Sequence, residues 1–200
     1  WNYTDVDRAF WRTHLEEWVP PRIFDAHTHI NEPEFDQVEM TEEKRRQYWV
    51  NELHATIGAD DAKRCMATVF PKRDVSCLCF GHPTLEFDIE GSNARLAEDC
   101  VRYGWYRMAV TRPQWSAEEV AAELDKPRTL GVKVYYALIE NDPTSRDKYL
   151  EASIFDFLPH HQLELLDERR AWVTLHVPKA DRLGHPDNIR EIRELRRRYP

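Results

Sequence analysis

The sequence predicts an α/β fold, a (β/α)8 (TIM) barrel of which this chain contains the first five βα units. Strand-like and helix-like segments alternate five times, which indicates parallel strands joined by right-handed crossovers. This alternation alone fits either a doubly wound open sheet or a barrel. Four of the five strands have one apolar and one polar face, whereas an open parallel sheet is apolar on both faces. The barrel is therefore expected, with the polar face lining its interior.

Five segments have the composition of strands. The second ends at Pro71, and the segment after it, which contains Cys77 and Cys79, is expected to be a long loop. A helical extension over residues 1–21 should precede the first strand, and residues 22–200 should form the barrel units. The expected strands cover residues 22–29, 64–70, 105–111, 130–137 and 171–177.

Helices are expected where apolar periodicity coincides with end signals. Thr4 is a candidate cap for a first helix, and Ser116 with Glu119 forms a capping box. Gly58 and Gly104 are expected to close the helices that precede them. The expected helices cover 4–18, 41–57, 92–103, a segment that opens at Ser116, a segment that ends near Arg170, and 187–199.

Side-chain alternation assigns each strand residue to a face, because neighbours in a strand point to opposite sides. In the first strand Phe24 and Ala26 should face the helices. The polar residues of the first, third, fourth and fifth strands should face the interior. These are Asp25, His27, His29, Arg107, Thr111, Lys133, Tyr135, Thr174 and His176.

The bulk composition is that of a globular protein of 200 residues with a net charge of -8. An acidic chain is not expected to bind nucleic acid, and no apolar run is long enough to suggest a membrane partner. The four cysteines do not have zinc-finger spacing, so we expect reduced thiols and a cytoplasmic location. A small-molecule substrate is the expected partner. The sequence leaves open whether the protein forms a homo-oligomer.

Three histidines at strand ends indicate a metal site. His27 and His29 are two residues apart, so both imidazoles leave the first strand on one side and can share a metal ion. His176 ends the fifth strand on the same expected face. Three imidazoles at one mouth would form a mononuclear zinc or iron site that acidifies bound water. Ordinary polar interior residues are the alternative for each of them.

Two segments resemble a known family. Phe24-Asp25-Ala26-His27-Thr28-His29 resembles the opening of the amidohydrolase superfamily. The segment from Leu175 to Asn188 is similar to the fifth-strand region of its amidohydrolase 2 branch, which includes aminocarboxymuconate-semialdehyde decarboxylase. The resemblance implies a (β/α)8 barrel and a divalent metal, most often Zn2+, held by His27, His29 and His176.

The family pattern also contains a catalytic His at the sixth strand and an Asp at the eighth. This chain stops at Pro200, after the fifth unit, so neither catalytic residue has a counterpart here. The expectation is that the chain is a fragment of a longer protein.

Lys133 and Asp25 have two readings. Some branches of the superfamily carry a carboxylated lysine at the fourth strand that bridges two metals. Otherwise Lys133 is an interior cation paired with a carboxylate such as Asp25, because a bare buried charge is costly. An arginine at the mouth could hold a substrate carboxylate through two hydrogen bonds. The candidates are Arg182, Arg112 and Arg73, and a plain surface charge is the alternative for each.

The expected function is that of a metal-dependent amidohydrolase-type hydrolase. A non-oxidative decarboxylase of an aromatic or unsaturated carboxylic acid is the first alternative. A non-catalytic barrel with a structural metal or none is the second. The sequence leaves the substrate open.

Overall fold

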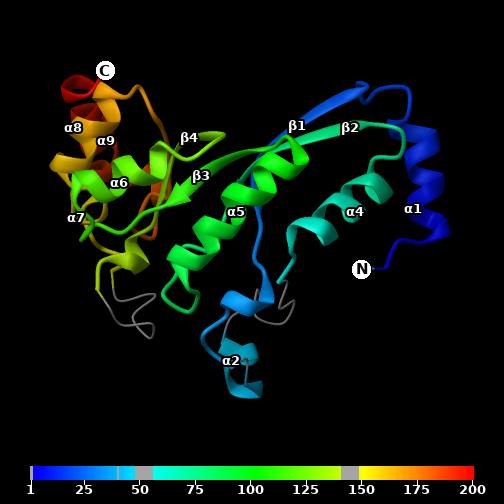
Figure 1. Ribbon diagram of the computed structural model, residues 1–200, viewed down its shortest axis with the longest axis horizontal. Coiled ribbons are helices and arrows are strands. Elements are labelled where there is room, and N and C mark those ends of the chain that lie inside the picture. The colour runs from blue at the N-terminus through cyan, green and yellow to red at the C-terminus, as the bar shows by residue number, and fades with distance from the viewer. Residues whose placement is uncertain (1, 40, 48–55, 141–148) are drawn as a thin grey trace.

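A five-stranded, all-parallel sheet that curls into a half-barrel forms the centre of the computed structural model (Figure 1). The structure describes residues 2–39, 41–47, 56–140 and 149–200. The strands pair in chain order, so the predicted α/β class and parallel arrangement are confirmed. They are β1 (Arg22–His29), β2 (Asp74–Phe80), β3 (Tyr106–Val110), β4 (Thr129–Val134) and β5 (Trp172–Leu175).

Several helices pack against one side of this sheet, while α1 and α2 lie apart from it (Figure 1). In Figure 1, α4 and α5 run beneath the strands β1 to β3, while α6, α8 and α9 gather around the end formed by β4 and β5. Within the described part of the chain, every helix is too short or too polar to cross a membrane. The helices are α1 (Asp5–Phe10), α2 (Glu42–Gln47), α4 (Ala59–Val69), α5 (Ile89–Tyr103), α6 (Ala117–Leu124), α7 (Ile154–Phe157), α8 (His160–Glu168) and α9 (Pro186–Arg198), with a π-helix η1 (Trp11–Leu15) and the 3-10 turns η2 (Pro33–Phe35), η3 (Tyr136–Leu138) and η4 (Arg182–Gly184).

Several helix ends follow the local sequence signals. The Ser116 hydroxyl accepts from the Glu119 backbone N–H, and the Glu119 carboxylate accepts from Ser116 N–H, so the predicted capping box opens α6. Gly104 ends α5 with a φ of 71°, a conformation that glycine adopts without steric cost. Gly58 instead precedes α4 as its N-cap. The expected helix over 41–57 lies partly outside the described residues.

The prediction for the second strand is wrong. Residues 64–70 belong to α4 and the turn after it, and the strand is β2. Ala59, Ala62 and Met66 recur at helical spacing and pack against the β2 layer. The alternation that marks the true strand is Val75, Cys77 and Cys79, all buried on the helix side.

The face assigned to Arg107 is also wrong. Its side chain is fully buried towards the helices, where Nη2 donates to Glu123 Oε2 at 2.8 Å. Nη1 donates to the Asn93 carbonyl at 2.9 Å, and Nε donates to the Thr129 hydroxyl at 2.7 Å. The charge of Arg107 is tolerated in the helix layer because Glu123 supplies the counter-charge. The Asn93 carbonyl and the Thr129 hydroxyl accept further hydrogen bonds from the guanidinium group.

A β-bulge changes the alternation of β1. Asp25 pairs with Cys77 and Thr28 with Cys79, so three steps in β1 match two in β2. Because of the extra residue, Asp25 pairs with Cys77, which faces the helices. Phe24, expected on the helix side, instead meets the ring of Tyr106 at 6.3 Å.

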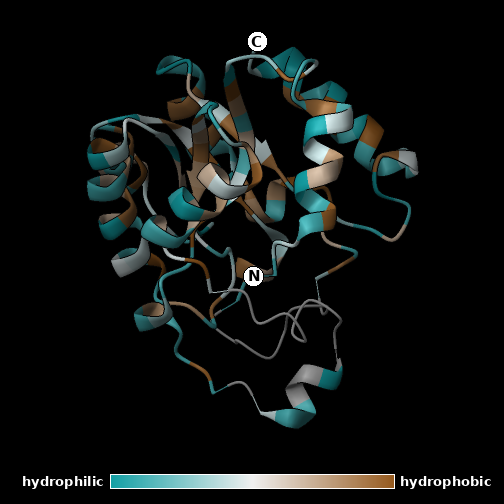
Figure 2. Ribbon diagram, turned by 90° about the vertical axis from the view of Figure 1, so that its right-hand side faces the viewer, coloured by the Kyte–Doolittle hydropathy of each residue, from teal (hydrophilic) through white to brown (hydrophobic). Residues whose placement is uncertain are grey.

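The interior orientation predicted for β4 is confirmed. Lys133 Nζ lies over the ring of Phe80, which also contacts His27 and His29. Figure 2 shows the apolar strands at the centre of the molecule and the polar helix surfaces around them. The concave face therefore combines an apolar floor with a few titratable groups near the C-terminal strand ends.

Candidate functional site

The pair His27 and His29 lies at the C-terminal end of β1. The two ring centroids are 5.4 Å apart, and both rings meet Phe80 edge-on, at 4.7 and 4.6 Å. The register shift of β1 falls between Asp25 and Thr28, and the contact of both rings with Phe80 places the two imidazoles on one face. In parallel α/β sheets this end of the strands is where functional sites form.

A third imidazole, from His82, joins this pair. Its ring lies 5.9 Å from that of His29 and stacks on Phe87 at 5.1 Å. His82 follows the end of β2, which places it at the same edge of the sheet. From the sequence, His82 is expected only in a loop at the barrel mouth, where a plain surface residue is the more common case, because the second strand was assigned to the wrong segment. The alternation through Cys77 and Cys79 was the signal that could have found it.

The surroundings of the pair favour neutral imidazoles. Burial, followed by the nearby His82, Lys133 and His27, lowers the pKa of His29. Burial and Lys133 likewise lower the pKa of His27, while Asp25 acts in the opposite direction. Both residues keep solvent-exposed surface, and water screens part of these effects. A neutral imidazole is the form that can bind a metal ion.

His176 lies one residue beyond β5, next to two tyrosines. Its ring is 4.4 Å from Tyr135 and 5.7 Å from Tyr136, and the Tyr135 hydroxyl donates to that of Tyr136 at 3.2 Å. Both tyrosines are buried. The structure thus places the His27 ring beside that of His29, and it places the His176 ring beside the rings of Tyr135 and Tyr136.

The described residues supply only part of a metal site. Among them, no three His, Cys, Asp or Glu side chains come close enough together to hold a metal ion. His27 and His29 fit two positions of such a site by their spacing and neutral state. The role of His176 as third ligand stays a prediction.

Lys133 is the cation of the concave face. The residue is 3% exposed, and its Nζ lies 5.0 Å from the centroid of the Phe80 ring. Burial lowers its pKa to about 8. The suggested pair with Asp25 does not form, since Asp25 is exposed and accepts from the His27 backbone N–H at 3.0 Å.

The three candidate arginines occupy different places. Arg73 precedes β2, so its expected position at the mouth is wrong. It donates to the carbonyls of Val19 and Glu16 and lies over the Trp11 ring, which ties the N-terminal segment to the sheet. The partly buried Arg112 follows β3, at the end of the sheet where the histidines lie. The exposed Arg182 donates to the Val177 carbonyl at 3.0 Å.

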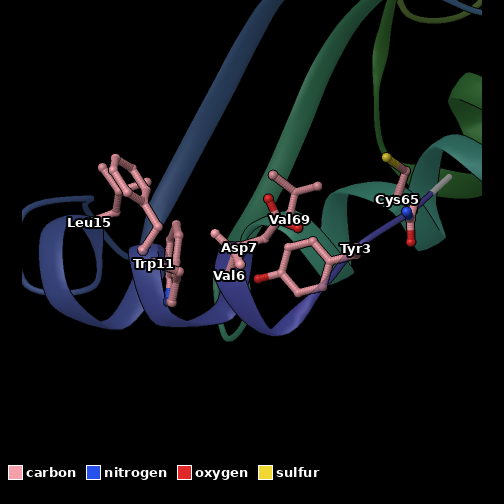
Figure 3. Close-up of a pocket in the computed structure, with 9 residues that line it drawn as sticks. Tyr3, Val6, Asp7, Trp11, Leu15, Cys65 and Val69 are labelled. Carbon is pink, nitrogen blue, oxygen red and sulfur yellow. The ribbon is translucent and has the colours of Figure 1, made fainter.

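A groove lies between the N-terminal helices and α4, as Figure 3 shows. Val6, Trp11, Leu15 and Val69 make its lining largely apolar, and Tyr3 and Asp7 contribute polar groups. None of the residues predicted for the site lines it. The histidine cluster is therefore the better candidate for chemistry.

Comparisons of this chain with protein-family models, with curated proteins and with solved structures found no match.

Proposed function

We propose that the protein is a metal-dependent hydrolase of the amidohydrolase type that acts on a small organic substrate. The observation that carries the proposal is the pair of adjacent imidazoles, His27 and His29, at the C-terminal end of a parallel strand. His176 is the proposed third ligand. A bound Zn2+ would supply an activated water near neutral pH.

The residues around the pair have distinct proposed tasks. His82 and Phe80 hold the ring of His29 in place through their edge and face contacts. The hydrogen bond from Tyr135 to Tyr136 gives the His176 end of the site two hydroxyl groups that can hold or pass a proton.

A decarboxylase is the second candidate, and the observation in its favour is Lys133. Among the described residues this buried ammonium group has no carboxylate partner, which suits a substrate that brings its own carboxylate. Hydrolysis and decarboxylation would use the same face of the sheet.

The proposal extends to the fold, as a (β/α)8 barrel of which the half-barrel is the first five units. It is supported by the two edge strands, β1 and β5, which each have one neighbour in the sheet. Phe24 on β1 and Trp172 on β5 are 50% and 60% exposed. Unpaired edge strands of a parallel sheet that carry exposed aromatic residues are uncommon in complete folds.

Zinc binding tests the proposal. Calorimetric titration of the metal-stripped protein with Zn2+ should give one site, and His27→Ala, His29→Ala and His176→Ala should each weaken it at least tenfold. The exposed His14 in η1 provides the matched control, and His14→Ala should bind like the parent. Undiminished binding by His27→Ala and His29→Ala would rule out the metal centre. A site that excludes water and supports no turnover would favour a structural metal.

A further inference from the structure

Lys133 differs from the other buried cations of this protein. Arg107 is paired with Glu123, and the Lys179 ammonium donates to the carbonyls of Glu151 and Ala152 at 3.0 and 2.8 Å. Within the described part of the chain, Lys133 Nζ has neither a hydrogen-bond partner nor an ion-pair partner. It lies over the ring of Phe80.

An ammonium group in this position is costly. A neutral aromatic ring attracts a cation, with about 2 kcal/mol when the pair is desolvated, but it brings no negative charge. Desolvating an unpaired ion costs several kcal/mol. Lys133 is 3% exposed. An anion bound at its nitrogen would supply the missing counter-charge.

The neighbours of Lys133 indicate the kind of anion. An ordinary imidazole is largely neutral at pH 7, so beside His27 and His29 the Lys133 ammonium supplies a positive charge. A single positive charge matches a carboxylate better than a doubly charged phosphate.

We propose that Lys133 anchors the carboxylate of a small organic monoanion on the concave face of the half-barrel. This assignment rests on the proposed function, since it names the substrate class of the same site. It assigns Lys133 the task of holding and orienting the anion, and it involves no covalent step.

The test measures anion binding without metal. Sodium benzoate is titrated into the protein at pH 7 in excess EDTA, and binding is followed by calorimetry and by the shift in melting temperature. Benzamide, a neutral compound of the same shape, and inorganic phosphate are the comparison ligands. The variants are Lys133→Met and Lys133→Arg, with Lys72→Met as control because the Lys72 side chain is 83% exposed.

Benzoate should bind the parent and Lys72→Met equally. Benzamide and Lys133→Met should each lose at least tenfold in affinity, and Lys133→Arg should retain part of it. Equal benzoate binding by Lys133→Met, equal binding of benzamide, or no benzoate binding by the parent would overturn the assignment. Tighter binding of phosphate would overturn the choice of a carboxylate.

The two proposals fail separately. Loss of the Zn2+ site with intact, Lys133-dependent benzoate binding would remove the metal centre and leave the anion site. Intact Zn2+ binding together with benzoate binding that does not depend on Lys133 would remove the anion site and leave the metal centre. Circular dichroism of each variant confirms that the fold is retained.

Discussion

Two buried cations on neighbouring strands have opposite surroundings. Arg107 on β3 faces the helices and donates to Glu123, Asn93 and Thr129. Lys133 on β4 faces the concave side and has the ring of Phe80 as its close contact. Both are almost fully buried, at 0% and 3% exposed.

The difference contrasts a cation that stabilises the fold with one that we propose to bind an anion. The bonds of Arg107 join β3 to α5 and α6, so this cation holds the helix layer to the sheet. The free energy spent on desolvating Lys133 is not recovered from a carboxylate among the described residues. A charge kept in such a place is typical of a binding site, where a ligand completes the pair.

The largest effect is expected at Arg107. Arg107→Met should lower the free energy of unfolding by about 3–5 kcal/mol, because it leaves the Glu123 carboxylate buried with less compensation. Urea denaturation measures the change. Arg102→Met is the control, since Arg102 is exposed and pairs with the exposed Asp60, and it should stay within about 0.5 kcal/mol. Equal stability of both variants would contradict a structural role for Arg107.

The opposite sign is expected at Lys133. The drop in its pKa from 10.5 to about 8 corresponds to about 3 kcal/mol of unfavourable burial. Lys133→Met should therefore raise the stability at pH 7 by up to that amount, while Lys72→Met leaves it unchanged. A loss of stability in Lys133→Met would show that the ammonium has a favourable partner.

The pH dependence sharpens the same comparison. Burial depresses the folded-state pKa of Lys133, so between pH 8 and 10.5 the unfolded chain binds more protons than the folded one. The penalty is complete below pH 8 and disappears as the pH rises to 10.5. Urea titrations at pH 7, 9 and 10.5 should show the advantage of Lys133→Met shrinking towards zero. If the difference in unfolding free energy between Lys133→Met and the parent stayed constant with pH, its cause would be a change in packing and not the charge of Lys133.

The smallest effect concerns the helix that carries Glu123. Ser116→Ala removes the hydroxyl that caps α6 and should cost about 1 kcal/mol. Thr4→Ala removes a hydroxyl that donates to the Asp7 carboxylate at the start of α1, a helix without buried residues, and should cost less. Thermal unfolding followed by circular dichroism compares the two. An equal loss would mean that α6 contributes no more to the folded core than α1 does.

Local signals in the sequence predicted much of the fold and of the candidate site. Parallel order followed from the alternation of elements, and the capping box at Ser116 and the closing glycine at 104 are read from adjacent residues. The His27 and His29 pair depends on a spacing within one strand. The second strand was missed because Arg64 to Phe70 and Asp74 to Phe80 are both apolar enough to be strands, and only packing distinguishes them.

By itself, the sequence determined the features whose causes lie within a few residues, namely the caps at Ser116 and Gly104 and the adjacent histidines, and the alternation of elements determined the parallel arrangement. Tertiary structure decided which way each charged strand residue points. Arg107 turns outwards because Glu123, sixteen residues later, satisfies it there. Lys133 turns inwards, where it meets Phe80 from a strand far earlier in the chain. The cost of burying a charge depends on such distant partners, and alternation along a single strand carries no information about them.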